Sequence, residues 1–368
     1  MVRFILVCLT FALMPATTIF SQTEPLKIGV AGLSHSHVHG ILGREDMGDI
    51  EIVGIAEPNR ELAQRYADQH GFSMDLVYDS LEEMIAATHP EAVTAFGSIY
   101  DHLKVVETCA PKGIHVMVEK PLAVSVAHAK KMKTLADKYH IQLLTNYETT
   151  WYPTNHKAKQ LLDDGKIGEL RKVIVRDGHR GPVKIGVNKE FLDWLQDPVL
   201  NGGGAITDFG CYGANLMTWL KKGQKPISVT AVTQQLQSEN NPKVDDDATI
   251  LLTYDDSMAI LEPSWNWPIG RKDMEIYGLT GAIFADNRNT LRVRMAEGYD
   301  GFQEEKMTLE ERSNPYNDPF SLLAAVIRGK VKLNPSDLTA LENNMTVVEI
   351  LEAAKESSQK GKTITLKK

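Results

Sequence analysis

Short apolar runs alternate with helical patterns from residue 26 to about residue 147, and this alternation limits the fold more than any other feature of the chain. The expected strands are 27–31, 50–56, 92–96, 115–118 and 141–145, and the helical patterns between them cover 60–70, 81–87, 103–112 and 125–139. Brief apolar strands separated by helices are typical of a parallel sheet with helices on both faces. We therefore expect an α/β protein whose N-terminal domain is a doubly wound parallel sheet.

After residue 151 the apolar runs become longer and follow one another through short turns such as D-D-S and L-T-G-A. Strands are expected at 171–177, 227–237, 248–254, 258–265 and 274–277, and helices at 153–164, after the glycines 202–204, at 319–328 and at 336–358. Runs joined by short turns predict an antiparallel sheet. The chain therefore divides into a first domain at 25–147 and a second α/β domain at 148–368, whose last helix can pack back on the first domain.

The first 22 residues have the layout of a cleavable secretory signal peptide, with an early Arg3, an apolar run, and then Pro15 and small or polar residues. A membrane anchor is the alternative, but this apolar run is too short to span a bilayer comfortably. We expect cleavage near Ser21 and a periplasmic mature protein. Only Cys109 and Cys211 then remain, in different domains, so we expect both thiols to be free.

The charge of the chain argues against a nucleic-acid partner. Its 368 residues carry a formal net charge of −8, and no basic stripe interrupts the spread of acidic residues. A length of this kind suggests about two domains, and an apolar content of 43% is enough to give each of them a core. No second membrane-spanning stretch follows the leader, so we expect no membrane contact after cleavage.

The loop after the first strand reads A-G-L-S-H-S-H-V-H-G at residues 31–40. In the dinucleotide-binding pattern G-x-G-x-x-G, the first glycine makes a tight turn, the second admits the pyrophosphate and the third lets the helix pack closely. Here Gly32 keeps the first position, and Ser34 and His37 replace the other two. A helix N-terminus still attracts an anion, and Ser34 or Ser36 can cap the helix or donate to a phosphate. We expect a rewritten cofactor loop.

Glu57 follows the second expected strand, 25 residues after Gly32. An acidic residue at this place suits the ribose hydroxyls of a dinucleotide, and its charge opposes a 2′-phosphate. This favours NAD, although the nearby Arg60 leaves NADP open.

Three histidines crowd the loop at His35, His37 and His39, spaced i, i+2 and i+4. Only an i, i+4 pair shares one face of a helix, and a zinc site needs a further ligand that the sequence does not place nearby. The alternatives are histidines that merely lie beside a pocket and histidines that contact phosphate or substrate. We expect no metal and assign His35 and His37 to the cofactor site.

V-M-V-E-K-P at residues 116–121 places Glu119, Lys120 and Pro121 at the end of an expected strand. The carboxyl ends of parallel strands face the ligand crevice of a doubly wound sheet. A surface lysine before a helix is the alternative, but this position favours a lysine held beside the cofactor.

The segment N-G-G-G-A-I-T-D-F-G-C-Y-G-A-N, residues 201–215, carries Asp208, Tyr212 and Asn215 at the spacing i, i+4, i+7. Such residues share one helical face, and a polar stripe on that face indicates a cavity lining, with a solvated helix face as the alternative. A phenol can exchange a proton with substrate. We expect Lys120 nearby, because an ammonium would lower the high pKa of the Tyr212 phenol.

The first-strand loop, E-K-P and G-G-G-x-x-x-D-x-G together resemble the Gfo/Idh/MocA oxidoreductases, and the likeness extends from about Leu26 to Leu366. The resemblance implies an N-terminal Rossmann domain and a C-terminal α/β domain with a large open antiparallel sheet that often serves in dimerisation. It also implies NAD or NADP as cofactor, a sugar or polyol as substrate, and a homo-oligomer.

The resemblance also implies roles for individual residues. Lys120 would contact the reacting hydroxyl, and Tyr212 stands where many members have an acid/base histidine, as in the glucose–fructose oxidoreductase and dihydrodiol dehydrogenase branch. Asp208 matches the family's retained aspartate, whereas Asn215 replaces a second aspartate. Three further residues are predicted to bind. His102 in I-Y-D-H is assigned to the cofactor, and Trp151 in T-T-W-Y-P and Asn215 are assigned to the substrate.

Two departures keep other functions open. The degraded glycine loop and the leader are compatible with a non-catalytic carbohydrate-binding relative that has lost its cofactor. Some similar proteins are NAD-dependent glycosidases that act through transient oxidation at C3 and elimination. The leading hypothesis is an exported sugar oxidoreductase, in which Tyr212 takes the hydroxyl proton and Asp208 orients the substrate or Lys120.

Overall fold

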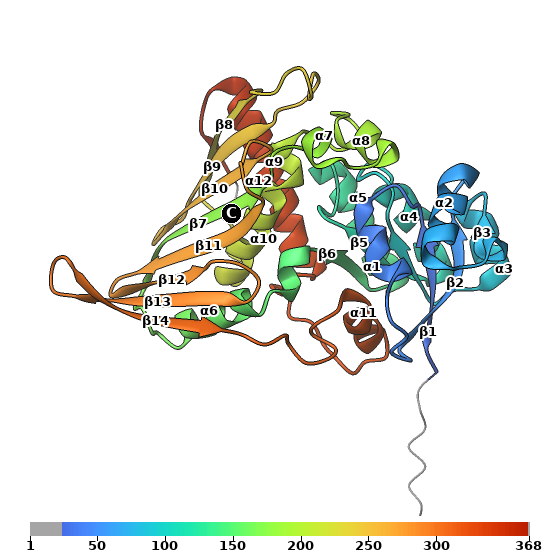
Figure 1. Cartoon of the computed structure of the whole chain (residues 1–368), viewed down its shortest axis with the longest axis horizontal. Helices are drawn as coiled ribbons and strands as arrows, with labels where there is room; N and C mark the ends of the chain where they lie inside the picture. Colours follow the sequence, from blue (N-terminus) through green and yellow to red (C-terminus); the bar gives the residue numbers. More distant parts are fainter. Residues whose placement is uncertain (1–23, 367–368) are drawn as a thin grey trace, which may run out of the picture.

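The computed structural model describes residues 24–366, which form two sheets with helices packed between and around them (Figure 1). The predicted leader lies outside the described residues. Of the helices that the structure describes, none is long and apolar enough to cross a membrane.

The N-terminal sheet has six parallel strands in the order β3-β2-β1-β4-β5-β6. These strands are β1 (Leu26–Ala31), β2 (Ile50–Ala56), β3 (Val77–Tyr78), β4 (Ala92–Ala95), β5 (His115–Glu119) and β6 (Leu143–Asn146). The strand order reverses between β1 and β4, and ligands of doubly wound sheets bind at this reversal. The predicted fold class is confirmed for this domain.

Helices α2 (Arg60–His70), α3 (Leu81–Thr88), α4 (His102–Cys109) and α5 (Val126–Tyr139) connect these strands, with short 3-10 turns at η2 (Met74–Leu76) and η3 (Ala110–Lys112). The first connection differs from the expectation of a full helix. It holds only the 3-10 turn η1 (Ser36–Val38) and the four-residue helix α1 (His39–Leu42). A helix this short has little aligned dipole to offer an anion, so side chains of the loop matter more.

The second sheet has nine strands in the order β14-β13-β12-β11-β7-β10-β9-β8-β15. They are β7 (Leu170–Gly178), β8 (Ser228–Gln234), β9 (Asp247–Thr253), β10 (Met258–Ser264), β11 (Arg271–Gly278), β12 (Gly281–Ala285), β13 (Thr290–Glu297), β14 (Gly301–Thr308) and β15 (Ile364–Thr365). The expected purely antiparallel sheet is wrong at one place, because β7 and β10 pair in parallel. Between these two strands the chain passes through four helices and two strands, and such a long connection allows a parallel return.

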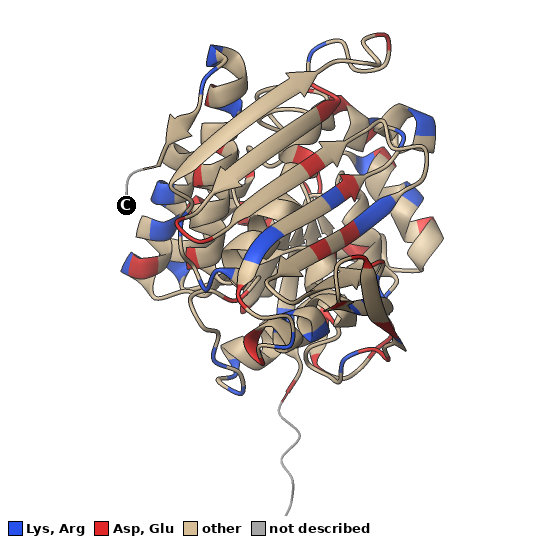
Figure 2. Cartoon of the chain, turned by 90° about the vertical axis from the view of Figure 1, so that its left-hand side faces the viewer, with Lys and Arg blue, Asp and Glu red and all other residues tan. Residues whose placement is uncertain are grey.

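The remaining elements are η4 (Glu148–Trp151), α6 (Pro153–Asp163), α7 (Pro182–Ile185), α8 (Lys189–Leu195), α9 (Ala205–Asp208), α10 (Gly210–Leu220), α11 (Pro319–Ile327) and α12 (Leu341–Lys360). One face of the nine-stranded sheet packs on α10 and α12, whereas Figure 2 shows the other face without helices over it. On that open face Arg176 forms ion pairs with Glu262 and Glu275 across neighbouring strands.

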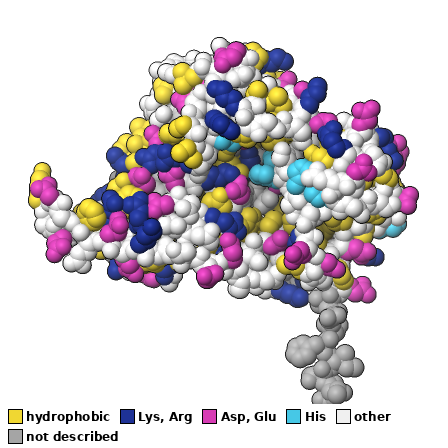
Figure 3. Space-filling model, viewed as in Figure 1, with side chains coloured by type: hydrophobic (Ala, Val, Ile, Leu, Met, Phe, Trp, Pro, Cys, Tyr) yellow, Lys and Arg dark blue, Asp and Glu magenta, His cyan; other side chains and the backbone are white. Residues whose placement is uncertain are grey.

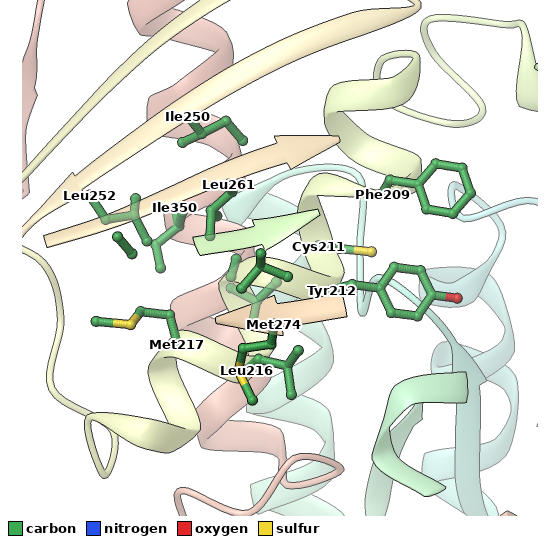
Figure 4. Close-up of a cluster of buried hydrophobic side chains, with 14 of the residues drawn as sticks. Phe209, Cys211, Tyr212, Leu216, Met217, Ile250, Leu252, Leu261, Met274 and Ile350 are labelled. Atoms are coloured by element: carbon green, nitrogen blue, oxygen red, sulfur yellow. The ribbon is translucent and has the colours of Figure 1, made fainter. Parts of the chain in front are cut away.

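The core of this domain joins the sheet to α10 and α12. Ile250, Leu261 and Met274 from three strands meet Leu216 of α10 and Ile350 of α12 (Figure 4), all of them buried. Alternate residues of each strand face this layer, as period-two alternation requires.

Helix α12 also contacts α5 and β6 of the first domain, where Met345 and Val348 join its core. Helix α11 packs beside β2 through Phe320 and Leu323. The two C-terminal helices thus fasten the domains together. Cys109 and Cys211 are both buried and free, which confirms the prediction for the thiols.

Candidate functional site

The carboxyl ends of β5 and β6 meet the C-terminal end of α9 and the N-terminal end of α10 where the two domains adjoin. Figure 3 shows this face of the molecule hollowed between the domains, with His, Lys or Arg, and Asp or Glu side chains gathered around the hollow. The candidate site is built from both domains.

Gly32 makes the tight turn that the sequence predicts. Its φ is +79°, and a Cβ at this residue would lie 2.9 Å from the backbone nitrogen of Gly97 in the loop after β4. Only glycine accepts both the left-handed conformation and this approach. A cavity of about 210 Å³ opens here, lined by Gly32, Gly97, Ser98, Asp101, His102, Ala31, Ala56, Pro58 and residues of α3 and α4.

The cap of the turn after the loop differs from the prediction. His35, rather than Ser34 or Ser36, caps η1, because its Nδ1 accepts the N–H of His37 at 3.1 Å. The Ser34 hydroxyl instead accepts a hydrogen bond from Trp194 Nε1 at 3.0 Å. The loop is therefore stiffened by side chains at positions where the usual pattern has glycine.

Glu57 is buried beneath the loop and accepts the backbone N–H of Leu33 and of Asn59, each at 2.8 Å. Burial raises the pKa of this carboxyl, and the two backbone donors oppose that shift. A carboxylate has about four lone-pair sites, so two remain for hydroxyls. Arg60 donates to the carbonyl of Val77 at 3.0 Å, which commits its guanidinium outside the loop.

His35 and His102 are fully buried, and the Nε2 atom of each lacks a partner among the described residues. Burial lowers the pKa of His102 to about 4 and that of His35 well below its usual value. Since His35 Nδ1 accepts a backbone N–H, its Nε2 carries the proton and is a donor. His102 Nδ1 lies 3.2 Å from the Leu122 carbonyl, which leaves its Nε2 as an acceptor. Buried polar atoms of this kind need a hydrogen-bond partner.

The loop cavity, the spare lone pairs of Glu57 and these two orphaned imidazole nitrogens fit a bound dinucleotide. Gly32, Glu57, His35 and His102 are the residues that would hold it.

The three loop histidines go to different partners. His39 Nδ1 lies 2.8 Å from His70 Nε2, so it is turned away from the other two. His37 Nδ1 lies 2.8 Å from Glu119 Oε2, and possible ligand atoms of His35, His37 and Glu119 all lie within 4.8 Å of one another. The expectation that no third metal ligand is near is therefore wrong. The lone pair of His35 Nδ1 already accepts a backbone N–H, whereas a metal-bound histidine normally donates through its other nitrogen.

Glu119 is buried at the end of β5 and also accepts a hydrogen bond from Asn146 Nδ2 at 2.7 Å. Trp151 in turn donates to Asn146 Oδ1 at 3.0 Å. Trp151 and His37 line a shared cavity of about 300 Å³. A chain of hydrogen bonds thus links the predicted substrate residue Trp151 to the E-K-P strand end.

Lys120 and Asp208 form a buried ion pair across the domain boundary. Asp208 also accepts from Trp265 Nε1 at 2.9 Å, and its backbone carbonyl lies 3.3 Å from Lys120 Nζ. Burial opposes charge on both partners, but their attraction prevails, raising the pKa of Lys120 and lowering that of Asp208. The ammonium is thus fixed in one place. The peptide bond between Lys120 and Pro121 is cis.

Tyr212 lies beside this pair, with Lys120 Nζ 5.3 Å from its ring centroid. Figure 4 shows Phe209 and Tyr212 pointing away from the apolar cluster. The predicted lowering of the Tyr212 pKa by Lys120 is wrong. Burial, followed by the charge of Glu148, raises that pKa well above its usual value, and the Lys120 charge is taken up by Asp208. The phenol is therefore held in its neutral form.

Asn215 does not share this face. It is fully buried nearly one turn further along α10 than Tyr212 and donates to the carbonyl of Leu338 at 2.8 Å. The predicted single helix is interrupted at Phe209, where α9 ends and α10 begins, so Asp208 leaves the common stripe. Asn215 fastens the C-terminal segment and is not in contact with the site.

The sequence reading missed three charged residues around Tyr212. Lys272 forms an ion pair with Glu148, and its Nζ lies 5.3 Å from the Tyr212 ring centroid. Asp177 is the last of the alternate β7 residues whose side chains face the core, and it is buried. A signal for Asp177 existed, because an acid stands where the alternation of this strand predicts an apolar residue. Lys272 and Glu148 carry no such signal, since they meet only in the folded chain.

Two family models match the chain. The model of the oxidoreductase family with an NAD-binding Rossmann fold matches residues 26–147, and the model of the GFO/IDH/MocA C-terminal domain matches residues 155–284.

The chain is also similar to individual proteins. It is 30% identical over 186 residues to trans-1,2-dihydrobenzene-1,2-diol dehydrogenase of Xenopus tropicalis, covering 50% of this chain and 52% of that protein. It is 25% identical over 218 residues to D-xylose 1-dehydrogenase [NADP(+)] of Haloarcula marismortui, covering 59% of each. The matches thus span about half the length of the first of these curated relatives.

Solved structures share the fold over nearly the whole chain. Aldose-aldose oxidoreductase from Caulobacter crescentus has a TM-score of 0.75 at 22% identity, covering 93% of this chain and 100% of that one. GenD2 from gentamicin A biosynthesis, solved in complex with NAD, has a TM-score of 0.75 at 22% identity, covering 97% and 100%. With the two family matches, this confirms the predicted family and its NAD-binding domain: the chain belongs to the GFO/IDH/MocA family of oxidoreductases.

Proposed function

We propose that this protein transfers hydride between a nicotinamide cofactor, NAD in preference to NADP, and a hydroxyl or carbonyl carbon of a sugar, polyol or related diol. The observation that carries the proposal is the buried Lys120–Asp208 pair beside Tyr212, placed at the carboxyl edge of the Rossmann sheet. Relatives named as a diol dehydrogenase and a xylose dehydrogenase support this substrate class.

The residues assigned to the cofactor are those around the loop cavity and the strand end. They are Gly32, Ser34, His35, His37, Glu57, His102, Glu119, Lys120 and Pro121. Glu57 would accept the ribose hydroxyls, and its charge would repel a 2′-phosphate. When bound, NAD⁺ supplies the acceptor for the hydride that leaves the substrate carbon.

Lys120 would hold the reacting oxygen of the substrate, with Asp208 fixing the ammonium in position. An ammonium placed where negative charge develops stabilises the transition state, and its value is greatest in a buried site. Trp265 orients the Asp208 carboxylate, and the carboxylate fixes the Lys120 ammonium, so little reorganisation is needed during the reaction.

Tyr212 would exchange the proton with that oxygen. Since the phenol is held neutral, it is ready to donate a proton to a carbonyl oxygen, and reduction of a ketone or aldehyde is the direction that this state favours. In the oxidative direction the Tyr212 phenolate would accept the hydroxyl proton of the alcohol. The phenolate must then be formed first, which predicts a rise of the oxidative rate with pH.

The test is a purification without added cofactor, followed by acid release and mass detection of any nicotinamide dinucleotide. Turnover is then measured with NAD⁺ or NADH against a panel of aldoses, ketoses and polyols. Bound dinucleotide with turnover of a sugar or polyol supports the proposal. Absence of binding, with no rise of the melting temperature on adding NAD⁺ or NADH, indicates a relative that has lost its cofactor. Cleavage of a chromogenic glycoside without net redox change indicates the glycosidase reaction.

We also propose that the protein is exported and cleaved near Ser21, a proposal supported by the arrangement of Arg3, the apolar run and Pro15. The mass of the mature protein from a periplasmic fraction tests it, and an intact Met1 in that fraction would contradict it. Export also bears on the cofactor, because a periplasmic enzyme must hold NAD tightly.

Assembly as a homo-oligomer is a further proposal, supported by the uncovered face of the nine-stranded sheet (Figure 2). Light scattering after gel filtration measures the mass directly, and a monomer at micromolar concentration would contradict it.

A further inference from the structure

Two lysines that are held in the same way lie beside the Tyr212 ring. Lys120 pairs with Asp208, and Lys272 pairs with Glu148, while each Nζ lies 5.3 Å from the ring centroid. The first pair belongs to the proposed reaction, whereas the second has no part in it. Glu148 also accepts a hydrogen bond from the Tyr152 hydroxyl at 2.6 Å, so both of its oxygens are oriented.

Asp177 is the unusual member of this second group. It is buried, and its Oδ1 has no hydrogen-bond partner among the described residues. Lys272 is its direct neighbour across the β7–β11 pair, on the same inward face. A lysine there would ordinarily form an ion pair with the aspartate, but the Lys272 ammonium is committed to Glu148 instead. A buried carboxyl without a partner lowers the stability of the protein that contains it.

A cavity of about 430 Å³ lies beside this group. Its lining includes Gly178 and Lys272, the chain neighbour and cross-strand neighbour of Asp177, together with Glu148, Tyr152, His179 and Phe209. Phe209 connects the cavity to the centre, since its ring stacks on that of Tyr212. The volume falls within the range of small-molecule sites, about 300–1,000 Å³.

We propose that Asp177, with Lys272 and Glu148, forms a second polar subsite that binds hydroxyl groups of the substrate away from the carbon that reacts. This inference rests on the proposed function and names the substrate class more closely. Asp177 accepts a hydroxyl hydrogen, and Lys272 donates to a hydroxyl oxygen. The substrate is therefore a polyhydroxylated chain or ring that reaches both Lys120 and Asp177, and a simple monohydric alcohol leaves Asp177 unpaired.

The first experiment tests whether Asp177 is kept at a cost in stability, and it needs no substrate. Asp177→Asn should melt at least about 2 °C above the wild type. The difference should grow from pH 6 to pH 9, because burial holds the pKa of Asp177 well above its usual value and the wild type loses stability as pH rises. Asp245→Asn is the control, since both oxygens of that half-buried carboxyl accept backbone N–H groups and its replacement should lower the melting temperature. A wild type more stable than Asp177→Asn at every pH overturns the inference.

The second experiment measures binding with D-xylose and D-sorbitol as probes. Wild type loaded with NADH should show a saturable rise in melting temperature at millimolar concentrations, and Asp177→Asn should lose it. The generic stabilisation by excluded polyols appears equally in both proteins, only at molar concentrations, and is subtracted. Equal saturable shifts in the two proteins overturn the inference. Loss of the shift only in Asp177→Asn, with no turnover by the wild type, would contradict the proposed reaction and support the subsite.

The third experiment separates positioning from a purely structural role. For the best aldose or polyol, Asp177→Asn should raise KM at least about tenfold, which corresponds to about 1.4 kcal/mol of binding, while kcat changes less than threefold. With propane-1,2-diol as a short substrate, the two proteins should have the same kcat/KM. An equal loss for long and short substrates overturns the inference, because it marks damage to the site as a whole.

Discussion

The two halves of the site handle buried polar groups in opposite ways. On the cofactor side, His35 and His102 are buried and uncharged, and each keeps one nitrogen without a partner. On the substrate side, Lys120 and Asp208 are buried as an ion pair, each with about 5% of its side chain exposed. Asp177 is the exception on the substrate side, because one oxygen of its buried carboxyl has no partner among the described residues and burial raises its pKa well above the usual value. Neutral donors and acceptors can stay unpaired at moderate cost, whereas buried charges cannot.

The two lysines beside Tyr212 also differ in how far their ion pairs are exposed to solvent. Lys120 and Asp208 are almost completely buried, whereas Lys272 and Glu148 are 21% and 39% exposed. Water can therefore screen the second pair and exchange with a ligand there. The buried pair suits the reacting centre, and the open pair suits substrate recognition.

The largest expected effect comes from breaking the buried pair. Lys120→Met should lower turnover at least about 10³-fold, since it removes both the charge at the reacting oxygen and its positioning. It should also lower the free energy of unfolding by about 3 kcal/mol, because Asp208 is left as a buried unpaired charge. Chemical denaturation and steady-state kinetics measure the two effects.

Lys355→Met is the control for this variant. Lys355 is half-buried and donates to the carbonyls of Val124 and Gly202. Its loss should cost stability without a comparable loss of turnover. Unchanged turnover in Lys120→Met would remove this lysine from the reaction.

Tyr212→Phe should lower turnover by about 10²–10³-fold, the usual contribution of a positioned acid or base. KM should change little, since the ring and its contacts with Phe209 remain. Tyr254→Phe is the matched control, because Tyr254 is buried in the same domain and its hydroxyl has no partner among the described residues. If both variants retain activity, proton transfer takes place elsewhere.

The cofactor half predicts a preference of about tenfold or more for NAD over NADP in kcat/KM, equivalent to about 1.4 kcal/mol. The reason is the Glu57 carboxylate at the loop, with Arg60 committed to the Val77 carbonyl. Steady-state kinetics with both cofactors measure the ratio. A preference for NADP would show that Arg60 turns inward when the cofactor binds.

The cofactor half also predicts a pH dependence of stability. The pKa of His102 is about 4 in the folded protein and about 6.5 when unfolded, so the unfolded chain takes up a proton first as pH falls. The free energy of unfolding should therefore drop by about 2 kcal/mol between pH 7 and pH 5 on account of this residue. His102→Asn, which can still donate to the Leu122 carbonyl, should lose that part of the acid sensitivity. An identical pH profile for both proteins would contradict the assignment of a neutral buried imidazole.

The first domain was predictable because its signals are local. The strand at 50–56 and the helix at 60–70 have the bounds that the sequence predicts. Strand β14 was missed because nearly all of its residues are exposed, so no alternation marks it. The parallel pairing of β7 with β10 was missed because it joins segments separated by about eighty residues of intervening chain.

The site divides in the same manner. Lys120 was identified from its position after a strand, which the E-K-P motif marks directly. The spacing alone assumes one continuous helix, whereas the chain breaks at Phe209 between Asp208 and Tyr212. Asn215 was misplaced because its partner, the Leu338 carbonyl, comes from a distant segment of the chain. The role of Lys120 as a fixed group depends on Asp208, a partner 88 residues away in the chain.

The sequence by itself determined the alternating strand–helix order, the family and the residue types at the ends of the strands, because period, turn and motif are properties of neighbouring residues. Only the tertiary structure decided the charge state of those residues. Whether Tyr212 is neutral, whether Asp208 is ionised and whether Asp177 has a partner depend on burial and on charges brought together from distant segments. Electrostatic energies in a protein are set by distance and desolvation in space, and the order of the residues along the chain does not contain them.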